Sequence, residues 1–209
     1  MITNVEARVI ETKFFDAYDL EDIDEKRYAV QMLLAWKEVY HLIERENNFT
    51  DKLGNEILDW QIGNWANDVT MALNNAQMYH ECIEVNEQIL KIEWKDDSTN
   101  LFYENAKRDI ADLYASLGDF KTCMNLYEKY LEEDPLWGWA WIGYFRQVHE
   151  DNDEQFEKIL DDLYHKIKSG VDFRDKEDLY YELKNEYEEL GNEERANYFS
   201  DLLKETIKR

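Results

Sequence analysis

The residues that could hold a metal are four histidines scattered among many carboxylates. A helical di-metal site needs paired Glu-x-x-His sequences facing one core, and the chain offers Glu38-x-x-His41 and Asp162-x-x-His165. Because 48 of the 209 residues are acidic, about one of the four histidines would follow an acid at this spacing by chance. The two pairs also lie far apart in the sequence. We therefore expect no metal and no cofactor.

A second candidate ligand pair is His80-Glu81-Cys82. Cys82, however, occupies the same place after Met78-Tyr79 that Cys123 occupies after Asp119-Phe120, at a position where small residues let two helices pack closely. Free cysteine commonly fills such buried positions. The sequence predicts two buried structural thiols.

A calcium loop begins at Asp151-x-Asp153-x-Gln155 but has Phe156 where the loop requires glycine. The chain contains no glycine-rich phosphate loop, no Gly-x-Ser-x-Gly sequence and no His-Glu-x-x-His sequence. Carboxylate pairs are too common on this chain to single one out for acid–base catalysis. No enzymatic activity is predicted.

The chain has a net charge of -24, which repels phosphate backbones and anionic membrane surfaces. Two interpretations of the acidic surface stay open: a solvated helical surface or an acidic binding face. Aromatic residues make up 14% of the chain, which argues against disorder. No signal peptide and no apolar window of 18 residues is found, so we expect a cytoplasmic protein that binds neither nucleic acid nor membrane.

Seven glycines and one proline are too few for the turns of an all-β protein, so an all-α fold is expected. Residues 25 to 46 predict an amphipathic helix with an apolar stripe, namely Tyr28, Met32, Leu33, Trp36, Val39, Tyr40 and Ile43. A second periodic stretch, with Thr50 as a candidate N-cap, carries Leu53, Ile57, Trp60, Trp65, Val69 and Leu73. Residues 1 to 23 fit either a helix, favoured for 12 to 20, or an extended arm.

The stretch from Ala106 to Tyr144 matches the tetratricopeptide consensus of W-x2-L-G-x2-Y, then A-x3-F, then P. Lys107 and Ala111 stand at its Trp and Gly positions, and Gly118 lies in the turn. The consensus positions fall on Lys107, Ile110, Ala111, Tyr114, Cys123, Tyr127 and Pro135. This stretch resembles one tetratricopeptide repeat, a helical hairpin.

Similar patterns before and after this repeat predict a tetratricopeptide-like, right-handed solenoid of helical hairpins. We expect one continuous domain over residues 1–209, with an uncertain N-terminal arm and leading helices before four hairpins. The expected boundaries are 1–24 for the arm, 25–61 for the leading helices, and 62–96, 104–137, 138–169 and 177–209 for the hairpins.

Three sequences in order resemble the helical repeat region of bacterial proteins that carry a SEC-C motif, over about residues 25–209. They are Trp65-Ala66-Asn67-Asp68-Val69, Leu73-Asn74-Asn75-Ala76 and Asp134-Pro135-x-Trp137-Gly138-Trp139. In that family a zinc-binding tail rich in Cys and His usually accompanies the repeats. This chain ends at Arg209 without such a tail, so we expect the tail's role to be absent or supplied by another chain.

An aromatic run follows the proline and includes Trp137, Trp139 and Trp141. We expect Trp141 and Tyr144 to fill a joint between hairpins, while Gly138 and Gly143 allow close helix contact. Trp139 and Ile142 are predicted on the side of their helix that faces a concave surface, where an apolar residue suggests a ligand.

The resemblance to tetratricopeptide arrays implies a non-enzymatic scaffold or adaptor that binds a peptide or helix of a partner protein in its groove. Arg108 and Arg146 are expected to meet a carboxylate there. The predicted groove residues are Asn64, Asn67, Met71, Asn74, Asn105, Arg108, Asp112, Trp139, Ile142, Arg146, His149, Tyr181 and Asn185. The alternative is a self-associating unit, a homodimer without a groove ligand.

Overall fold

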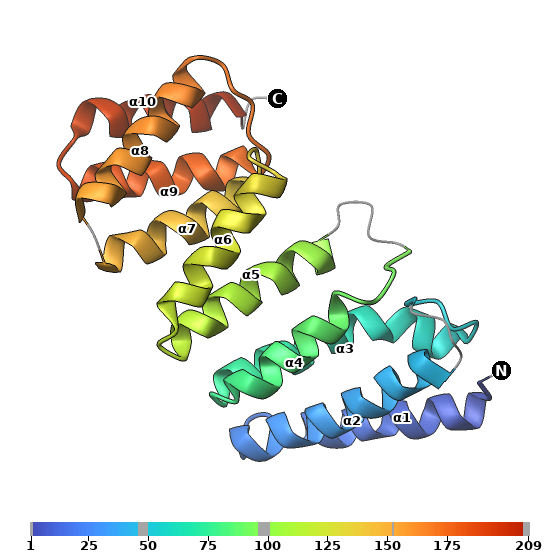
Figure 1. Ribbon diagram of the computed structural model, residues 1–209. Helices are drawn as coiled ribbons and strands as arrows, with labels where there is room; N and C mark the ends of the chain where they lie inside the picture. Colours follow the sequence, from blue (N-terminus) through green and yellow to red (C-terminus); the bar gives the residue numbers. More distant parts are fainter. Residues whose placement is uncertain (1, 46–49, 96–100, 152, 207–209) are drawn as a thin grey trace. The chain divides into compact units, whose positions relative to one another are not determined.

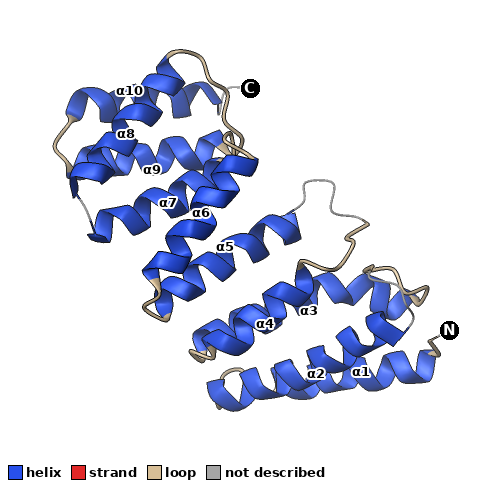
Figure 2. Ribbon diagram, viewed as in Figure 1, coloured by secondary structure: helices blue, strands red, loops and turns tan. Residues whose placement is uncertain are grey.

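The computed structural model describes residues 2–45, 50–95, 101–151 and 153–206, and every regular element in these ranges is an α-helix (Figures 1 and 2). The predicted all-α class is therefore confirmed. The helices are α1 (Asn4–Tyr18), α2 (Glu25–Arg45), α3 (Glu56–Asn75), α4 (Tyr79–Ile89), α5 (Leu101–Ser116), α6 (Phe120–Glu133), α7 (Gly138–Asp151), α8 (Asp153–Lys168), α9 (Lys176–Glu189) and α10 (Glu193–Thr206).

The chain forms two compact units, Met1–Gly118 with α1 to α5 and Asp119–Arg209 with α6 to α10. Each unit has its own hydrophobic core. The boundary falls inside the repeat predicted from the sequence, so the hairpin expected at 104–137 has one helix in each unit. One continuous solenoid domain stays a prediction.

The N-terminal segment is a helix, the first of the two alternatives, and it is longer than the predicted 12–20. Thr3 caps it, because its Oγ1 accepts a hydrogen bond from the Glu6 N–H at 3.2 Å while the Glu6 carboxylate accepts one from the Thr3 N–H at 2.8 Å. Ala7 is buried, whereas Val5 and Val9 on either side are exposed. Although Val5, Ala7 and Val9 alternate along the sequence as in a strand, they belong to a helix with a narrow buried face.

The start of α3 differs from the prediction. Thr50 is buried and its backbone forms an isolated bridge with Glu93, so it is not the N-cap. Asn55 takes that role, because its Oδ1 accepts hydrogen bonds from the Ile57 N–H at 3.2 Å and the Leu58 N–H at 3.4 Å. The predicted cap was wrong because several polar residues precede this helix and only the backbone geometry selects among them.

Other helix ends have ordinary caps and stops, including the turn predicted at Gly118. Asp24 accepts a hydrogen bond from the Arg27 N–H at 3.0 Å at the start of α2. Gly118, Gly170 and Gly191 have φ angles of +79°, +93° and +69°, and each follows the end of a helix. Glycine tolerates this left-handed conformation, in which a helix commonly stops.

In the N-terminal unit, α2 packs against α1 and α3, and α4 packs against α3 and α5. Phe14 and Trp65 stack in its core, with ring centroids 4.1 Å apart. The ring of Phe102 in α5 lies against α3 at Gly63, where a Cβ atom would be 2.8 Å from its Cζ. Glycine at position 63 therefore leaves room for the Phe102 ring against α3.

In the C-terminal unit, two glycines of the aromatic run make the close contacts that the sequence predicted. A Cβ at Gly143 would lie 2.2 Å from the Tyr127 ring, and one at Gly138 would lie 2.4 Å from the Arg174 carbonyl oxygen. Trp141 and Tyr144 are partly buried and pack against the core of this unit. The run is thus largely structural.

Candidate functional site

The predicted groove residues fall in both units, so each set is described within its own unit. Asn64, Asn67, Met71, Asn74, Asn105, Arg108 and Asp112 belong to α3 and α5 of the N-terminal unit. Trp139, Ile142, Arg146, His149, Tyr181 and Asn185 belong to α7 and α9 of the C-terminal unit.

In the C-terminal set, Ile142 was wrongly predicted to face a groove. Its exposed fraction is 1%, because it lies three residues before the buried Phe145 and shares the face of α7 that forms the core. Tyr181 is exposed, while Trp139 and Asn185 are partly buried.

The charged residues of that set already have partners within the unit. The Arg146 guanidinium lies 2.7 Å from the Glu182 carboxylate, and His149 Nδ1 lies 3.9 Å from that of Glu186. The His149 ring also stacks on Phe156, with centroids 4.1 Å apart. A partner carboxylate would compete with Glu182 for Arg146.

In the N-terminal set, four predicted residues lie on one exposed face of α3, and a fifth residue extends it. We call these residues the α3 stripe, which consists of Trp60, Asn64, Asn67, Met71 and Asn74. Steps of four and three residues keep side chains on one helix face. No member is charged, although 34% of the chain is charged. The stripe is therefore unlike the rest of the surface.

Trp60 is the functional candidate that the sequence pattern misplaced. It was assigned to the buried stripe, but 78% of it is exposed. The buried face of α3 instead runs through Leu58, Ile62 and Trp65. The sequence signal for the exposure of Trp60 is its position four residues before Asn64, which puts both side chains on the same face of α3.

A pocket of about 200 Å³ opens between α3, α4 and α5, and we call it the α3–α5 pocket. It brings together Met71, Asn74 and Asp112 of the predicted set, but Asn105 and Arg108 do not line it. The lining residues are Thr70, Met71, Asn74, Cys82, Asp109, Asp112, Leu113 and Ser116. The pocket adjoins the C-terminal half of the α3 stripe, with which it shares two residues.

Asp109 is the distinctive group in this pocket. Burial raises the pKa of its carboxyl to about 6, the nearby Asp112 adds to the rise, and Arg108 opposes it. No hydrogen bond within the described part of the chain ends on this carboxylate. Asp109 is thus an anion held in a half-buried place without a hydrogen-bond donor, which is costly unless something pairs with it.

Cys82 forms part of the pocket wall and confirms the predicted buried thiol, as does Cys123. Its Sγ donates a hydrogen bond to the Thr70 carbonyl oxygen at 3.4 Å. Burial, together with the charge of Asp109, raises the pKa of the thiol to about 12. The thiol therefore stays protonated at neutral pH and is a poor nucleophile.

Replacing Asp109 by asparagine should stabilise the protein at neutral pH. The pKa of Asp109 is higher in the folded chain than its ordinary value of 3.8. The contribution of Asp109 to the stability of the fold is therefore fully present below about pH 3.8, and it is lost as the pH rises through about 6. Allowing for partial solvent screening, we expect Asp109→Asn to raise the free energy of unfolding by about 1–2 kcal/mol at pH 7.5.

Urea denaturation followed by circular dichroism at pH 7.5 and pH 4 measures this effect. The gain should nearly vanish at pH 4, where the aspartate is protonated in the folded chain. Asp16→Asn, at an exposed position of α1, is the matched control and should change little at either pH. A destabilised Asp109→Asn variant at pH 7.5 would show that the carboxylate has a structural partner.

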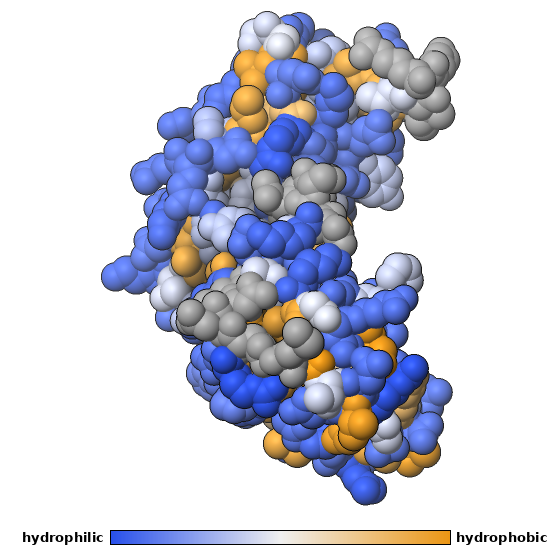
Figure 3. All heavy atoms as spheres, turned by 90° about the vertical axis from the view of Figure 1, so that its right-hand side faces the viewer, coloured by the Kyte–Doolittle hydropathy of each residue, from blue (hydrophilic) through white to orange (hydrophobic). Residues whose placement is uncertain are grey.

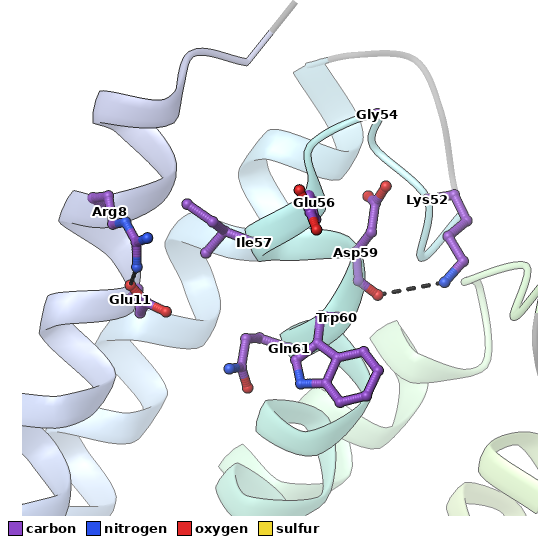
Figure 4. Close-up of a pocket in the computed structure, with 9 residues that line it drawn as sticks. All are labelled: Arg8, Glu11, Lys52, Gly54, Glu56, Ile57, Asp59, Trp60 and Gln61. Carbon is purple, nitrogen blue, oxygen red and sulfur yellow. Dashed lines mark hydrogen bonds and ion pairs between the residues drawn. The ribbon is translucent and has the colours of Figure 1, made fainter.

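A second, wider hollow of about 920 Å³ lies beside Trp60 and is drawn in Figure 4. Arg8 pairs with Glu11 at 2.5 Å, and Lys52 Nζ donates to the Asp59 carbonyl oxygen at 3.4 Å. These contacts occupy the cations that line it, so we assign no chemistry to the hollow. Its effect is to leave the Trp60 ring accessible from the side.

An apolar surface lies between α1 and α2. Val5 and Val9 are 74% and 51% exposed, and with Ile10 and Leu42 they line a hollow of about 490 Å³. Figure 3 shows hydrophobic residues among hydrophilic ones at the lower end of the picture, where α1 and α2 lie. Self-association would act on such a surface, and the homodimer stays a prediction.

Of the two sequence pairs considered for metal binding, Glu38 and His41 belong to the N-terminal unit, and Asp162 and His165 belong to the C-terminal unit. Glu38 pairs with Lys13, and His165 lies 3.5 Å from Asp161. Within the described ranges, no three His, Cys, Asp or Glu residues gather as metal ligands. The side chains of Asp151 and Asp153 lie outside what the structure describes.

None of the helices in the described ranges is long and apolar enough to cross a membrane. No protein-family model matches the chain, and no curated protein matches it. The resemblance to tetratricopeptide repeats and SEC-C proteins therefore stays a prediction.

Proposed function

We propose that this protein is a non-enzymatic interaction module that binds an extended segment of a partner protein along the α3 stripe. The observation that supports this function is the uncharged, exposed face of α3 on a chain of net charge -24. A purely solvating surface has no need of an exposed tryptophan and methionine on one helix face. Protein-binding surfaces commonly concentrate both residue types.

Each residue type in the stripe suits peptide binding. Trp60 offers a large ring with one N–H donor, and burying roughly 150 Å² of it is worth about 4 kcal/mol at about 25 cal/mol per Å². Met71 is 63% exposed and can adapt its shape to a neighbouring side chain. The amides of Asn64, Asn67 and Asn74 can both donate to and accept from a peptide backbone.

The length of the stripe sets the length of the ligand. From Trp60 to Asn74 the helix rises about 21 Å, at 1.5 Å per residue. An extended peptide covers that distance with about six residues, at roughly 3.3 Å each. A short linear segment is therefore the expected ligand.

The order of the helices supports the same proposal. α3 and α4 form a hairpin, and α5 lies beside both, through the Gly63 contact with α3 and by packing on α4. In the tetratricopeptide arrangement, first helices of successive hairpins line the concave binding surface. We propose that α3 and α5 are such helices in a tetratricopeptide-like protein.

Selection from a displayed library of random seven-residue peptides tests this function without a known partner. Clones that bind the full chain are screened against a Trp60→Ser/Met71→Asn variant. We expect peptides that bind the native chain and lose binding to this variant. The matched control is Phe15→Ser/Leu34→Asn, which removes exposed apolar residues from α1 and α2. If no selected clone discriminates between the native chain and the stripe variant, the α3 stripe is not a peptide-binding surface.

A further inference from the structure

The size of the α3–α5 pocket indicates what kind of group it can hold. Sites for small molecules usually enclose about 300–1,000 Å³, whereas this pocket has about 200 Å³. One amino-acid side chain fits such a volume. Because Met71 and Asn74 belong to both the pocket and the α3 stripe, a peptide on the stripe can place one side chain into the pocket.

The pocket walls differ in character. Met71 and Leu113 offer apolar surface, and Asp109 and Asp112 offer carboxylates. Lysine and arginine side chains have a matching division, with an apolar stem and a charged end. No lysine, arginine or histidine lines the pocket.

The Asp109 carboxylate selects the charge of the ligand. It accepts no hydrogen bond within the described residues, and its surroundings withdraw it from water. A cationic group would supply both the counter-charge and the missing donors, and charge-assisted hydrogen bonds of this kind are strong. An acidic side chain would be repelled, and a neutral apolar one would leave the carboxylate unpaired.

Among the charged groups around Asp109, Asp112 favours a cationic ligand, whereas Arg108 opposes it from outside the pocket lining. Both lie on the same helix as Asp109, and Cys82 faces Asp109 from α4 as a neutral thiol. The pocket residues of α3 are Thr70, Met71 and Asn74, none of which titrates. A calcium ion is a poorer fit, because only two carboxylates line the pocket, and no three His, Cys, Asp or Glu side chains of the described residues are placed to hold a metal ion.

We infer that the α3–α5 pocket receives the ammonium or guanidinium group of a lysine or arginine side chain of the bound peptide. This inference rests on the proposed function and makes it more specific. The net charge of -24 supports it at longer range, since it attracts basic segments before contact.

The test uses the full chain labelled with ¹³C at the methionine methyl groups. The probes are N-acetyl-lysine methylamide, N-acetyl-arginine methylamide and the uncharged N-acetyl-norleucine methylamide. We expect the Met71 methyl signal, assigned with Met71→Leu, to shift in a saturable manner with a Kd on the order of 1 mM for one or both cationic probes. The probe that binds more tightly identifies the side chain. Norleucine should leave the signal in place.

Asp109→Asn should weaken binding of the cationic probe at least tenfold, whereas Asp16→Asn should not change it. Circular dichroism checks that each variant is folded. Three results would overturn the inference: no shift with either cation, an equal shift with norleucine, or an undiminished shift in Asp109→Asn. Any of these leaves the peptide selection intact as a separate test, because discrimination by the Trp60→Ser/Met71→Asn variant does not depend on a basic residue.

Discussion

Replacing Trp60 by serine should weaken binding of a peptide selected on the α3 stripe by roughly 30- to 1,000-fold. This range corresponds to about 2–4 kcal/mol, the usual cost of removing a tryptophan that anchors an interface, with 1.4 kcal/mol per factor of ten. Because 78% of Trp60 is exposed, the substitution removes little from the fold. Isothermal titration measures the change in affinity.

The controls for Trp60→Ser separate binding from folding. The melting curve of the variant should match that of the native chain, since surface substitutions usually change stability by less than about 0.5 kcal/mol. Leu34→Asn removes another exposed apolar side chain, on α2, and should leave affinity unchanged. If Trp60→Ser keeps the native affinity and Leu34→Asn loses affinity, the peptide binds to α2 and not to the α3 stripe.

Replacing Gly143 by alanine should destabilise the C-terminal unit by about 2–3 kcal/mol. The new Cβ would lie 2.2 Å from the Cζ and hydroxyl oxygen of Tyr127, a ring with an exposed fraction of 0%. Inserting a methyl group into a packed core typically costs about 1–3 kcal/mol and occasionally more. The better helix propensity of alanine returns up to about 1 kcal/mol. Because an approach of 2.2 Å to a buried ring places the cost at or above the top of that range, about 3–4 kcal/mol, the net loss is about 2–3 kcal/mol.

Chemical denaturation followed by circular dichroism measures the loss in Gly143→Ala. Asn197→Ala, at an exposed position in α10, is the matched control and should be nearly neutral. The double variant Gly143→Ala/Tyr127→Leu should lose less stability than the two single variants lose in sum, because the ring that clashes with the new methyl group is absent. A Gly143→Ala protein as stable as the native chain would mean that α6 and α7 are not packed this closely.

The sequence predicted the helices well because their apolar stripes are long. The helix predicted at 25–46 is observed as Glu25–Arg45, and Gly118 lies in the turn after α5, as predicted. Gly138 and Gly143 were correctly predicted to allow close contact. The prediction of each helix rests on several apolar residues with the same periodicity, so one ambiguous residue does not change the predicted helix.

The faces of single residues were predicted less well. Trp60 and Ile142 are both apolar and lie near the border between a buried and an exposed face, where a shift of one residue, about 100°, changes the assignment. Trp60 proved exposed and Ile142 buried. Hydrophobicity alone cannot resolve such borders, because the neighbouring helix decides which residues it covers.

Asp109 was missed for a different reason. It is one of 48 acidic residues, and nothing in its sequence neighbourhood distinguishes it. Its character comes from the packing of α5 against α4 and from the residues of α3 that complete the pocket around it. Such a site requires the structure.

The most direct test of the central claim, that a partner segment binds along the α3 stripe, is an NMR titration of the full chain with a selected peptide. The Trp60 indole N–H signal, assigned with Trp60→Phe, and the Met71 methyl signal are followed together. The proposal predicts that both shift with one binding curve, while the indole signal of Trp141 in the C-terminal unit stays in place. If the peptide binds and neither Trp60 nor Met71 responds, while the Val5 and Val9 methyl signals shift, the binding surface lies on α1 and the proposal is wrong.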